Sequence, residues 1–87
     1  MEQLKYGYHK NEIIKGTLGE ISKIQEELDE LKDAHEQNNK ILSLCELADM
    51  VGAMKAYIKK HHIGTSFEDL EIMADATKRS FINGERK

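Results

Sequence analysis

Apolar residues recur at helical spacing in three stretches of this chain, with polar residues between them. In the first stretch, residues three or four positions apart are apolar: Ile21, Ile24, Leu28 and Leu31. Such spacing places them on one face of a helix. Thr17 and Glu20 stand three residues apart just before this stretch, as the N-cap and its partner in a capping box. We therefore predict a first helix that starts at TLGE and ends near HEQNNK.

The second apolar stretch predicts a helix from about Lys40 to His61. Asn38 and Asn39 suit the turn and the N-cap before it, and the basic KKHH at its end suits the negative end of the helix dipole. One side carries Leu44, Leu47, Val51, Met54 and Ile58, and another carries Leu42, Met50, Ala53 and Tyr57. A helix that is apolar over most of its circumference packs on more than one neighbour. We expect some of those neighbours to come from a second subunit.

A third helix is predicted to begin after a capping box formed by Ser66 and Asp69 and to end at Gly84. Its apolar side consists of Leu70, Met73, Ala74, Thr77 and Phe81. Residues 1–16 alternate weakly between apolar and polar, which is compatible with a short strand, a hairpin or an arm. We expect an all-α fold in a single domain over residues 1–87, with residues 1–16 as an N-terminal arm and residues 84–87 as a tail.

The composition limits the classes of partner. The formal net charge of −3 gives no electrostatic reason to expect nucleic acid, whose binding proteins usually present a basic face. No apolar run approaches the roughly 20 residues that cross a bilayer, and the single Cys45 excludes an internal disulfide framework. We expect a cytoplasmic protein with neither a nucleic-acid nor a membrane partner. A chain this short buries only about 60–65% of its unfolded surface, so oligomerisation would stabilise it.

Two pairs of carboxylates stand at matching spacing on the first two helices. Glu27 and Glu30 are three residues apart, as are Glu46 and Asp49, so each pair shares a helix face. The short connector favours an antiparallel hairpin, in which the two pairs can converge on one cleft. Alone, EELDEL is typical of a solvated helix face, and the second pair can bind basic residues of a partner helix.

Four converging carboxylates need cations, because each buried carboxylate loses its hydration and like charges repel. The apolar stretch around Glu46 and Asp49 offers no Lys or Arg. Mg²⁺ prefers oxygen ligands and keeps waters while it binds phosphates, and Mn²⁺ is a possible substitute. No His or Cys stands at ligand spacing in this motif, which argues against zinc.

The sequence KIQEELDELKDA followed by LCELADMVGA resembles the MazG-like, all-α nucleoside triphosphate pyrophosphohydrolases, as a compact, phage-type or single-domain member. That family carries an EExxE helix, matched by Glu26, Glu27 and Glu30, and an ExxD helix, matched by Glu46 and Asp49. The resemblance covers about residues 16–61 and the third helix loosely. It implies a Mg²⁺-dependent hydrolase that cleaves an NTP or dNTP into a nucleoside monophosphate and pyrophosphate.

The resemblance also implies roles and an assembly. The metal ligands would be Glu27, Glu30, Glu46 and Asp49. Glu27 or Glu30 would accept the proton of the attacking water, with Glu26 behind them in the second shell of the metal. Candidates for contacts with the substrate phosphates lie late in the chain: Lys78, Arg79, Asn83 and Arg86. A homodimer or homotetramer would complete a four-helix-bundle active site.

Two alternatives stay open at the level of the sequence. A phosphoribosyl-ATP pyrophosphohydrolase shares the helical architecture, and a non-catalytic helical interaction module can use the same acids to bind metal or a basic partner.

Overall fold

The computed structural model of the chain describes residues 9–82. Within this range the chain forms three helices and no strand: α2 (Ile21–Glu36), α3 (Lys40–His61) and α4 (Phe67–Ile82). The prediction of one small, all-α domain is confirmed for the described part of the chain. No helix among these residues is long and apolar enough to cross a membrane.

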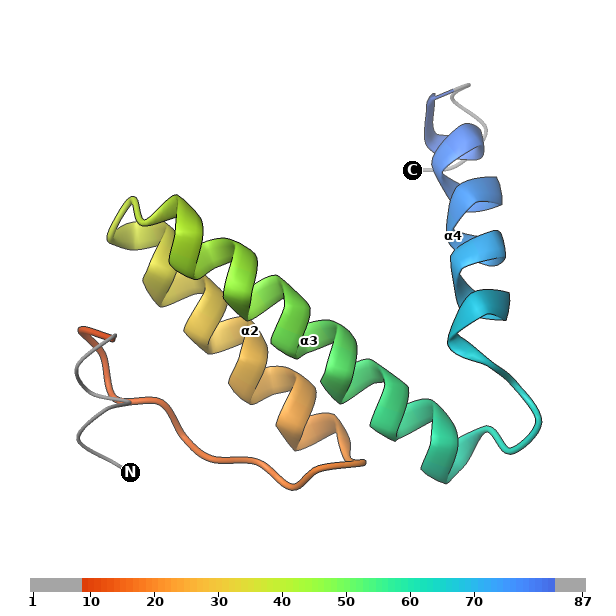
Figure 1. Cartoon of the computed structure of the whole chain (residues 1–87), viewed down its shortest axis with the longest axis horizontal. Helices are drawn as coiled ribbons and strands as arrows, with labels where there is room; N and C mark the ends of the chain where they lie inside the picture. The colour runs from red at the N-terminus through yellow and green to blue at the C-terminus, as the bar shows by residue number, and fades with distance from the viewer. Residues whose placement is uncertain (1–8, 83–87) are drawn as a thin grey trace.

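Helices α2 and α3 form an antiparallel hairpin (Figure 1). Asn38 turns the chain with a φ of 57°, a left-handed conformation that asparagine adopts more readily than most residues. The Asn39 side chain then accepts a hydrogen bond of 2.9 Å from the backbone N–H of Leu42. This N-cap fixes the start of α3 where the sequence predicted it.

The start of α2 differs from the prediction. Glu20 rather than Thr17 is the N-cap, and no side chain caps the helix. The Glu20 carboxylate instead reaches the far end of α3, where it binds Lys60 and lies 3.3 Å from Nε2 of His61. The predicted capping box is therefore wrong, because two basic residues from the neighbouring helix take the acid that would have closed it.

An extended N-terminal segment, residues 9–16, runs alongside α2 (Figure 1). Residues 9–16 form no strand, and we call this segment the arm; residues 1–8 lie outside the described part of the chain. The arm passes very close to the helix at Gly16, where an added Cβ atom would lie 2.1 Å from the backbone oxygen of Ser22. Only glycine fits there. The Gly16 N–H donates a 2.8 Å hydrogen bond to Oε1 of Glu26, which ties the arm to α2.

Helix α4 begins with the predicted capping box. The Ser66 N–H donates to Oδ2 of Asp69, and the Asp69 N–H donates to Oγ of Ser66, both at 3.0 Å. The rest of α4 stands away from the hairpin (Figure 1), so apolar residues such as Met73 remain exposed. Its predicted end at Gly84 lies outside the described residues.

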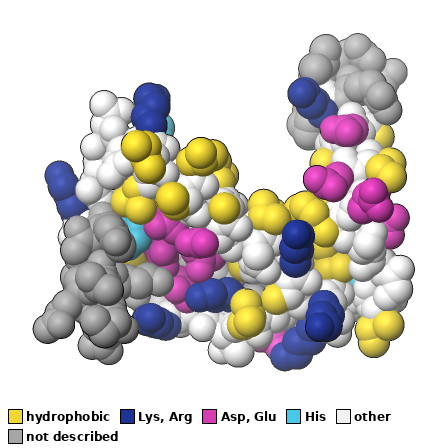
Figure 2. All heavy atoms as spheres, viewed as in Figure 1, with side chains coloured by type: hydrophobic (Ala, Val, Ile, Leu, Met, Phe, Trp, Pro, Cys, Tyr) yellow, Lys and Arg dark blue, Asp and Glu magenta, His cyan; other side chains and the backbone are white. Residues whose placement is uncertain are grey.

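The hairpin buries few apolar side chains within one chain. Among the described residues, the buried hydrophobic ones are Ala34, Ala53 and Ile58. Larger apolar residues face outward, including Leu44 of α3 with 69% of its surface exposed. Figure 2 shows such hydrophobic side chains in several patches on the hairpin and along α4. The inner face of the hairpin is acidic instead.

Candidate functional site

Acidic side chains fill the face that α2 turns toward α3 and the arm. Positions 26, 27, 30 and 33 repeat at helical spacing, and all four are buried: Glu26, Glu27, Glu30 and Asp33. Helix α3 adds Glu46, with only 4% of its surface exposed. Figure 2 shows acidic side chains gathered into one patch over the hairpin. We call these five residues, together with Asp49, the acidic cluster.

The two predicted carboxylate pairs meet in this cluster. Ligand oxygens of Glu27, Glu46 and Asp49 lie within 4.8 Å of one another, and Glu30 lies equally close to Glu26 and Glu27. Asp49 is exposed, so it marks the side from which solvent reaches the cluster. The structure thus brings together Glu27 and Glu30 from α2 with Glu46 and Asp49 from α3, while their catalytic and metal-binding roles stay predictions.

Burial and mutual repulsion set the charge of the cluster. Loss of hydration, followed by the charge of Glu30, raises the pKa of Glu46 to about 8. The same two causes, in the same order, raise the pKa of Glu27, although Lys23 lies 3.4 Å away and opposes them. Among the described residues, Oε1 of Glu27 and Oε1 of Glu46 are buried and have no hydrogen-bond partner. The cluster therefore disfavours negative charge on Glu27 and Glu46, because little among the described residues compensates that charge.

Glu26 is joined to the arm and to Lys23, and its predicted place behind the metal ligands stays a prediction. Its Oε1 accepts hydrogen bonds from the backbone N–H of Gly16 and from Nζ of Lys23, at 2.8 and 3.2 Å. Burial lowers the pKa of Lys23, but Glu26 and Glu27 outweigh it, and the pKa is raised. Lys23 thus stays positively charged beside the cluster, and Glu26 connects it to the arm.

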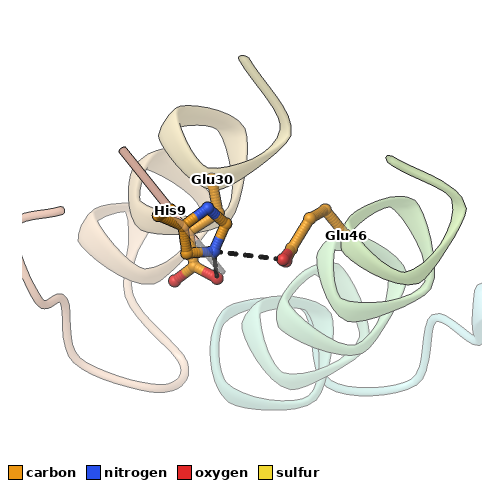
Figure 3. Close-up of side chains that lie close together, drawn as sticks. All are labelled: His9, Glu30 and Glu46. Carbon is orange, nitrogen blue, oxygen red and sulfur yellow. Dashed lines mark ion pairs between the residues drawn. The ribbon is translucent and has the colours of Figure 1, made fainter. Parts of the chain in front are cut away.

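Two residues of the site, His9 and Asp33, were missed at the level of the sequence. The His9 ring is buried, and its Nδ1 lies 2.9 Å from Oδ2 of Asp33. Its Nε2 lies 3.4 Å from Oε1 of Glu30 and 3.3 Å from Oε2 of Glu46 (Figure 3). The inference that no histidine stands at ligand spacing holds along the helices, but the arm carries one into the cluster.

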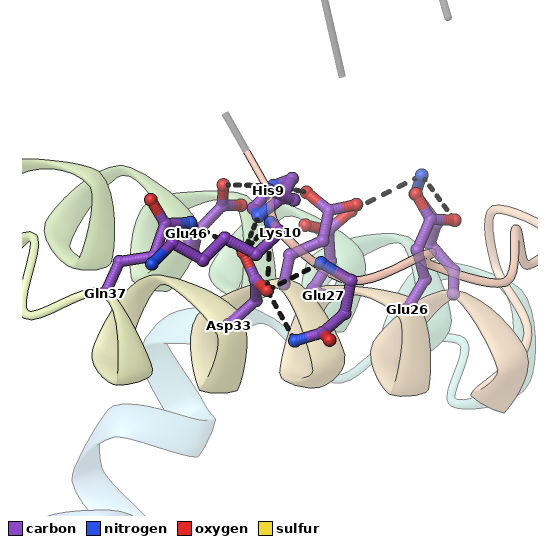
Figure 4. A network of polar contacts seen from close by, with 10 residues as sticks. His9, Lys10, Glu26, Glu27, Asp33, Gln37 and Glu46 are labelled. Atoms are coloured by element: carbon purple, nitrogen blue, oxygen red, sulfur yellow. Dashed lines mark hydrogen bonds and ion pairs between the residues drawn. The ribbon is translucent and has the colours of Figure 1, made fainter. Parts of the chain in front are cut away.

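Asp33 anchors the arm. Its two oxygens accept hydrogen bonds from the backbone N–H groups of Lys10 and Asn11, from the Asn11 side chain and from Gln37 (Figure 4). Burial alone would raise the pKa of Asp33, yet these donors and His9 lower it. Asp33 continues the helical register of Glu27 and Glu30, which is a signal that could have found it. His9 lies in a segment without helical periodicity and offers no such signal.

The predicted phosphate-binding residues lie apart from the acidic cluster or outside the described side chains. Lys78 is exposed on α4, which stands away from the hairpin. The side chains of Arg79, Asn83 and Arg86 are not among those that the structure describes. Within one chain, the phosphate-binding role of these four residues stays a prediction.

Comparison of the sequence with protein-family models finds no match, and comparisons with curated proteins and with solved structures find none either. The resemblance to the MazG-like enzymes therefore rests on the two sequence motifs alone.

Proposed function

We propose that this chain is a homo-oligomeric, Mg²⁺-dependent nucleotide pyrophosphohydrolase, which cleaves an NTP or dNTP into a nucleoside monophosphate and pyrophosphate. One observation carries the proposal: two carboxylate pairs from adjacent antiparallel helices converge on one site. This is the arrangement in which the EExxE and ExxD motifs of the MazG-like enzymes would act together.

The residues of the cluster fit a hard divalent cation. Glu27 and Glu46 each hold a buried oxygen without a hydrogen-bond partner among the described residues, and Mg²⁺ and Mn²⁺ favour carboxylate oxygens. We propose Glu27, Glu30, Glu46 and Asp49 as the ligands. When bound, Mg²⁺ would neutralise charge on the phosphates of the substrate and on the carboxylates around it.

The chain's own residues supply proton transfer and positioning. A carboxylate with a raised pKa is a stronger base, and the pKa of Glu27 is raised by burial and by Glu30. We propose that Glu27 or Glu30 accepts the proton of the attacking water. Lys23, held beside Glu26 and Glu27, offers a positive charge at the edge of the site. We propose that the substrate approaches the cluster on the side of Asp49, which is exposed.

Assembly of two or more chains would complete the site. The outward leucines of α3 and the apolar side of α4 need a covering surface, and a second hairpin would provide it as part of a four-helix bundle. In a homodimer or homotetramer of this kind, α4 of one chain can reach the cluster of another. Lys78, Arg79, Asn83 and Arg86 would then contact the substrate phosphates. We place the enzyme in the cytoplasm, where the free thiol of Cys45 would stay reduced.

The decisive experiment compares Glu27→Gln with Asp29→Asn on the same helix. Asp29 is only partly buried and binds Gln25 rather than the cluster, at 3.0 Å. Pyrophosphate release is measured with Mg²⁺ and a panel of NTPs, dNTPs and phosphoribosyl-ATP, with circular dichroism as the folding control. We expect Glu27→Gln to lower kcat by about 10²–10⁴-fold and Asp29→Asn to leave it nearly unchanged. Wild-type rates in both variants, or no release by the wild type, would refute the proposed function.

A further inference from the structure

The arm places one nitrogen ligand against two carboxylates. Nε2 of His9 lies within 3.4 Å of an oxygen of Glu30 and within 3.3 Å of an oxygen of Glu46 (Figure 3). The ligand atoms of all three side chains lie within 4.8 Å of one another, and all three residues are buried. The second carboxylate oxygen of Glu46, Oε1, is also buried and has no hydrogen-bond partner among the described residues.

The other nitrogen of the ring fixes which atom faces the carboxylates. Nδ1 of His9 lies 2.9 Å from Asp33, and a carboxylate only accepts hydrogen bonds, so Nδ1 carries a hydrogen and donates it. In the neutral ring, Nε2 then presents a lone pair to Glu30 and Glu46. Three electron-rich atoms cannot stay together unless a positive charge lies between them. That charge is a metal ion or a proton, and the proton can sit on Nε2 or on a carboxyl group.

The distances leave room for a metal ion between the three side chains. Charge-assisted N–H···O hydrogen bonds measure about 2.7–2.9 Å, which is clearly shorter than either contact of Nε2. Metal–nitrogen and metal–oxygen bonds of about 2.1 Å in a tetrahedral site place neighbouring ligands about 3.4 Å apart. The contacts of His9 with Glu30 and Glu46 match this second spacing. Asp33 on Nδ1 is the carboxylate partner that metal-binding histidines commonly have.

We propose that His9, Glu30 and Glu46 form a binding site for a divalent transition-metal ion, with Asp33 as the residue that orients the imidazole. An imidazole nitrogen suits zinc, copper, cobalt or iron better than magnesium, which prefers oxygen ligands alone. This site shares Glu30 and Glu46 with the proposed magnesium site but differs in His9. It does not require that the chain hydrolyse nucleotides, and it makes the arm a part of the metal site.

The test is metal binding by the full chain in the absence of nucleotide. Co²⁺ is titrated by visible absorption and Mg²⁺ by calorimetry, with His9→Gln compared against His35→Gln at the exposed end of α2. We expect His9→Gln to weaken Co²⁺ binding by at least about tenfold and to change Mg²⁺ affinity by less than about threefold. His35→Gln should match the wild type for both ions. Asp33→Asn should weaken Co²⁺ binding by about 10–100-fold, as loss of an orienting partner does.

A spectroscopic readout separates ligation from general effects on folding. Pulsed electron paramagnetic resonance of the Cu²⁺-loaded protein should show coupling to an imidazole nitrogen in the wild type and in His35→Gln, and none in His9→Gln. Unchanged Co²⁺ affinity in a folded His9→Gln variant would overturn the proposal. Should that variant not fold, the wild-type spectrum decides, since a spectrum without nitrogen coupling also overturns it. Neither result bears on Mg²⁺-dependent hydrolysis, which is measured separately.

Discussion

Replacing Glu46 with Gln should stabilise the metal-free protein at neutral and alkaline pH. The pKa of this carboxyl is raised from 4.5 to about 8, first by burial and then by the charge of Glu30. The folded state therefore binds the proton more tightly than the unfolded state, and stability falls as the pH rises from about 4.5 to about 8. At about 1.4 kcal/mol per pKa unit, the upper bound is about 5 kcal/mol. Because relaxation and water reduce such penalties, we expect about 1–3 kcal/mol.

The measurement is urea unfolding followed by circular dichroism between pH 4.5 and 8.5, with chelator and at one protein concentration. As the pH rises across this range, the free energy of unfolding of the wild type should fall relative to that of Glu46→Gln. At pH 4.5 the two proteins should have nearly the same free energy of unfolding. Glu71→Gln on the exposed surface of α4 is the matched control and should follow the wild type. Saturating Mg²⁺ should remove most of the difference. Parallel pH profiles for the wild type and Glu46→Gln would refute the assigned burial cost.

Two further predictions concern the arm and the assembly. Gly16→Ala would place a methyl group 2.1 Å from the Ser22 backbone oxygen, so the arm should leave α2 and become sensitive to limited proteolysis. Gly52→Ala, where nothing lies within 4 Å of the added atom, should leave the protease sensitivity of the arm unchanged. Equal protease resistance in both variants would contradict the close approach of the arm to α2. Leu44→Lys changes a side chain that is 69% exposed in one chain, so sedimentation should show a dimer or larger wild-type species at micromolar concentration and a folded monomer for the variant. A wild type that is already monomeric would contradict the proposed assembly.

The helices were predictable where local signals decide them. Asn39 and Ser66 cap α3 and α4 as expected, because each side chain meets a backbone group within three residues. The start of α2 was not predictable in this way. Glu20 meets Lys60, which lies 40 residues further along the chain, and no local pattern reports such a contact.

Local patterns also predict one part of the site, the carboxylates on the two helices, but not the other part, His9 on the arm. The approach of Glu27 to Glu46 could be predicted from helical spacing and a short connector, which favours antiparallel neighbouring helices. His9 meets Asp33 across 24 residues of chain, from an arm that has neither helical periodicity nor caps. Its place depends on side-chain hydrogen bonds to Asp33 and on a glycine that permits close approach, and these appear only once the helix face is built.

In most small domains apolar side chains are buried and charged side chains are exposed, but the hairpin buries acidic side chains and exposes leucines. This arrangement links stability to function. Glu46 is buried while Leu44, two residues earlier, is exposed, so a single metal-free chain carries the cost of the acids without the full benefit of its apolar residues. A cation present at about 100 times its dissociation constant would contribute about 2.7 kcal/mol, which is similar to the expected cost at Glu46. A second subunit would bury the outward leucines. We therefore expect metal binding and assembly to stabilise the same folded state, in which the carboxylates are already held where a triphosphate and its cation would need them.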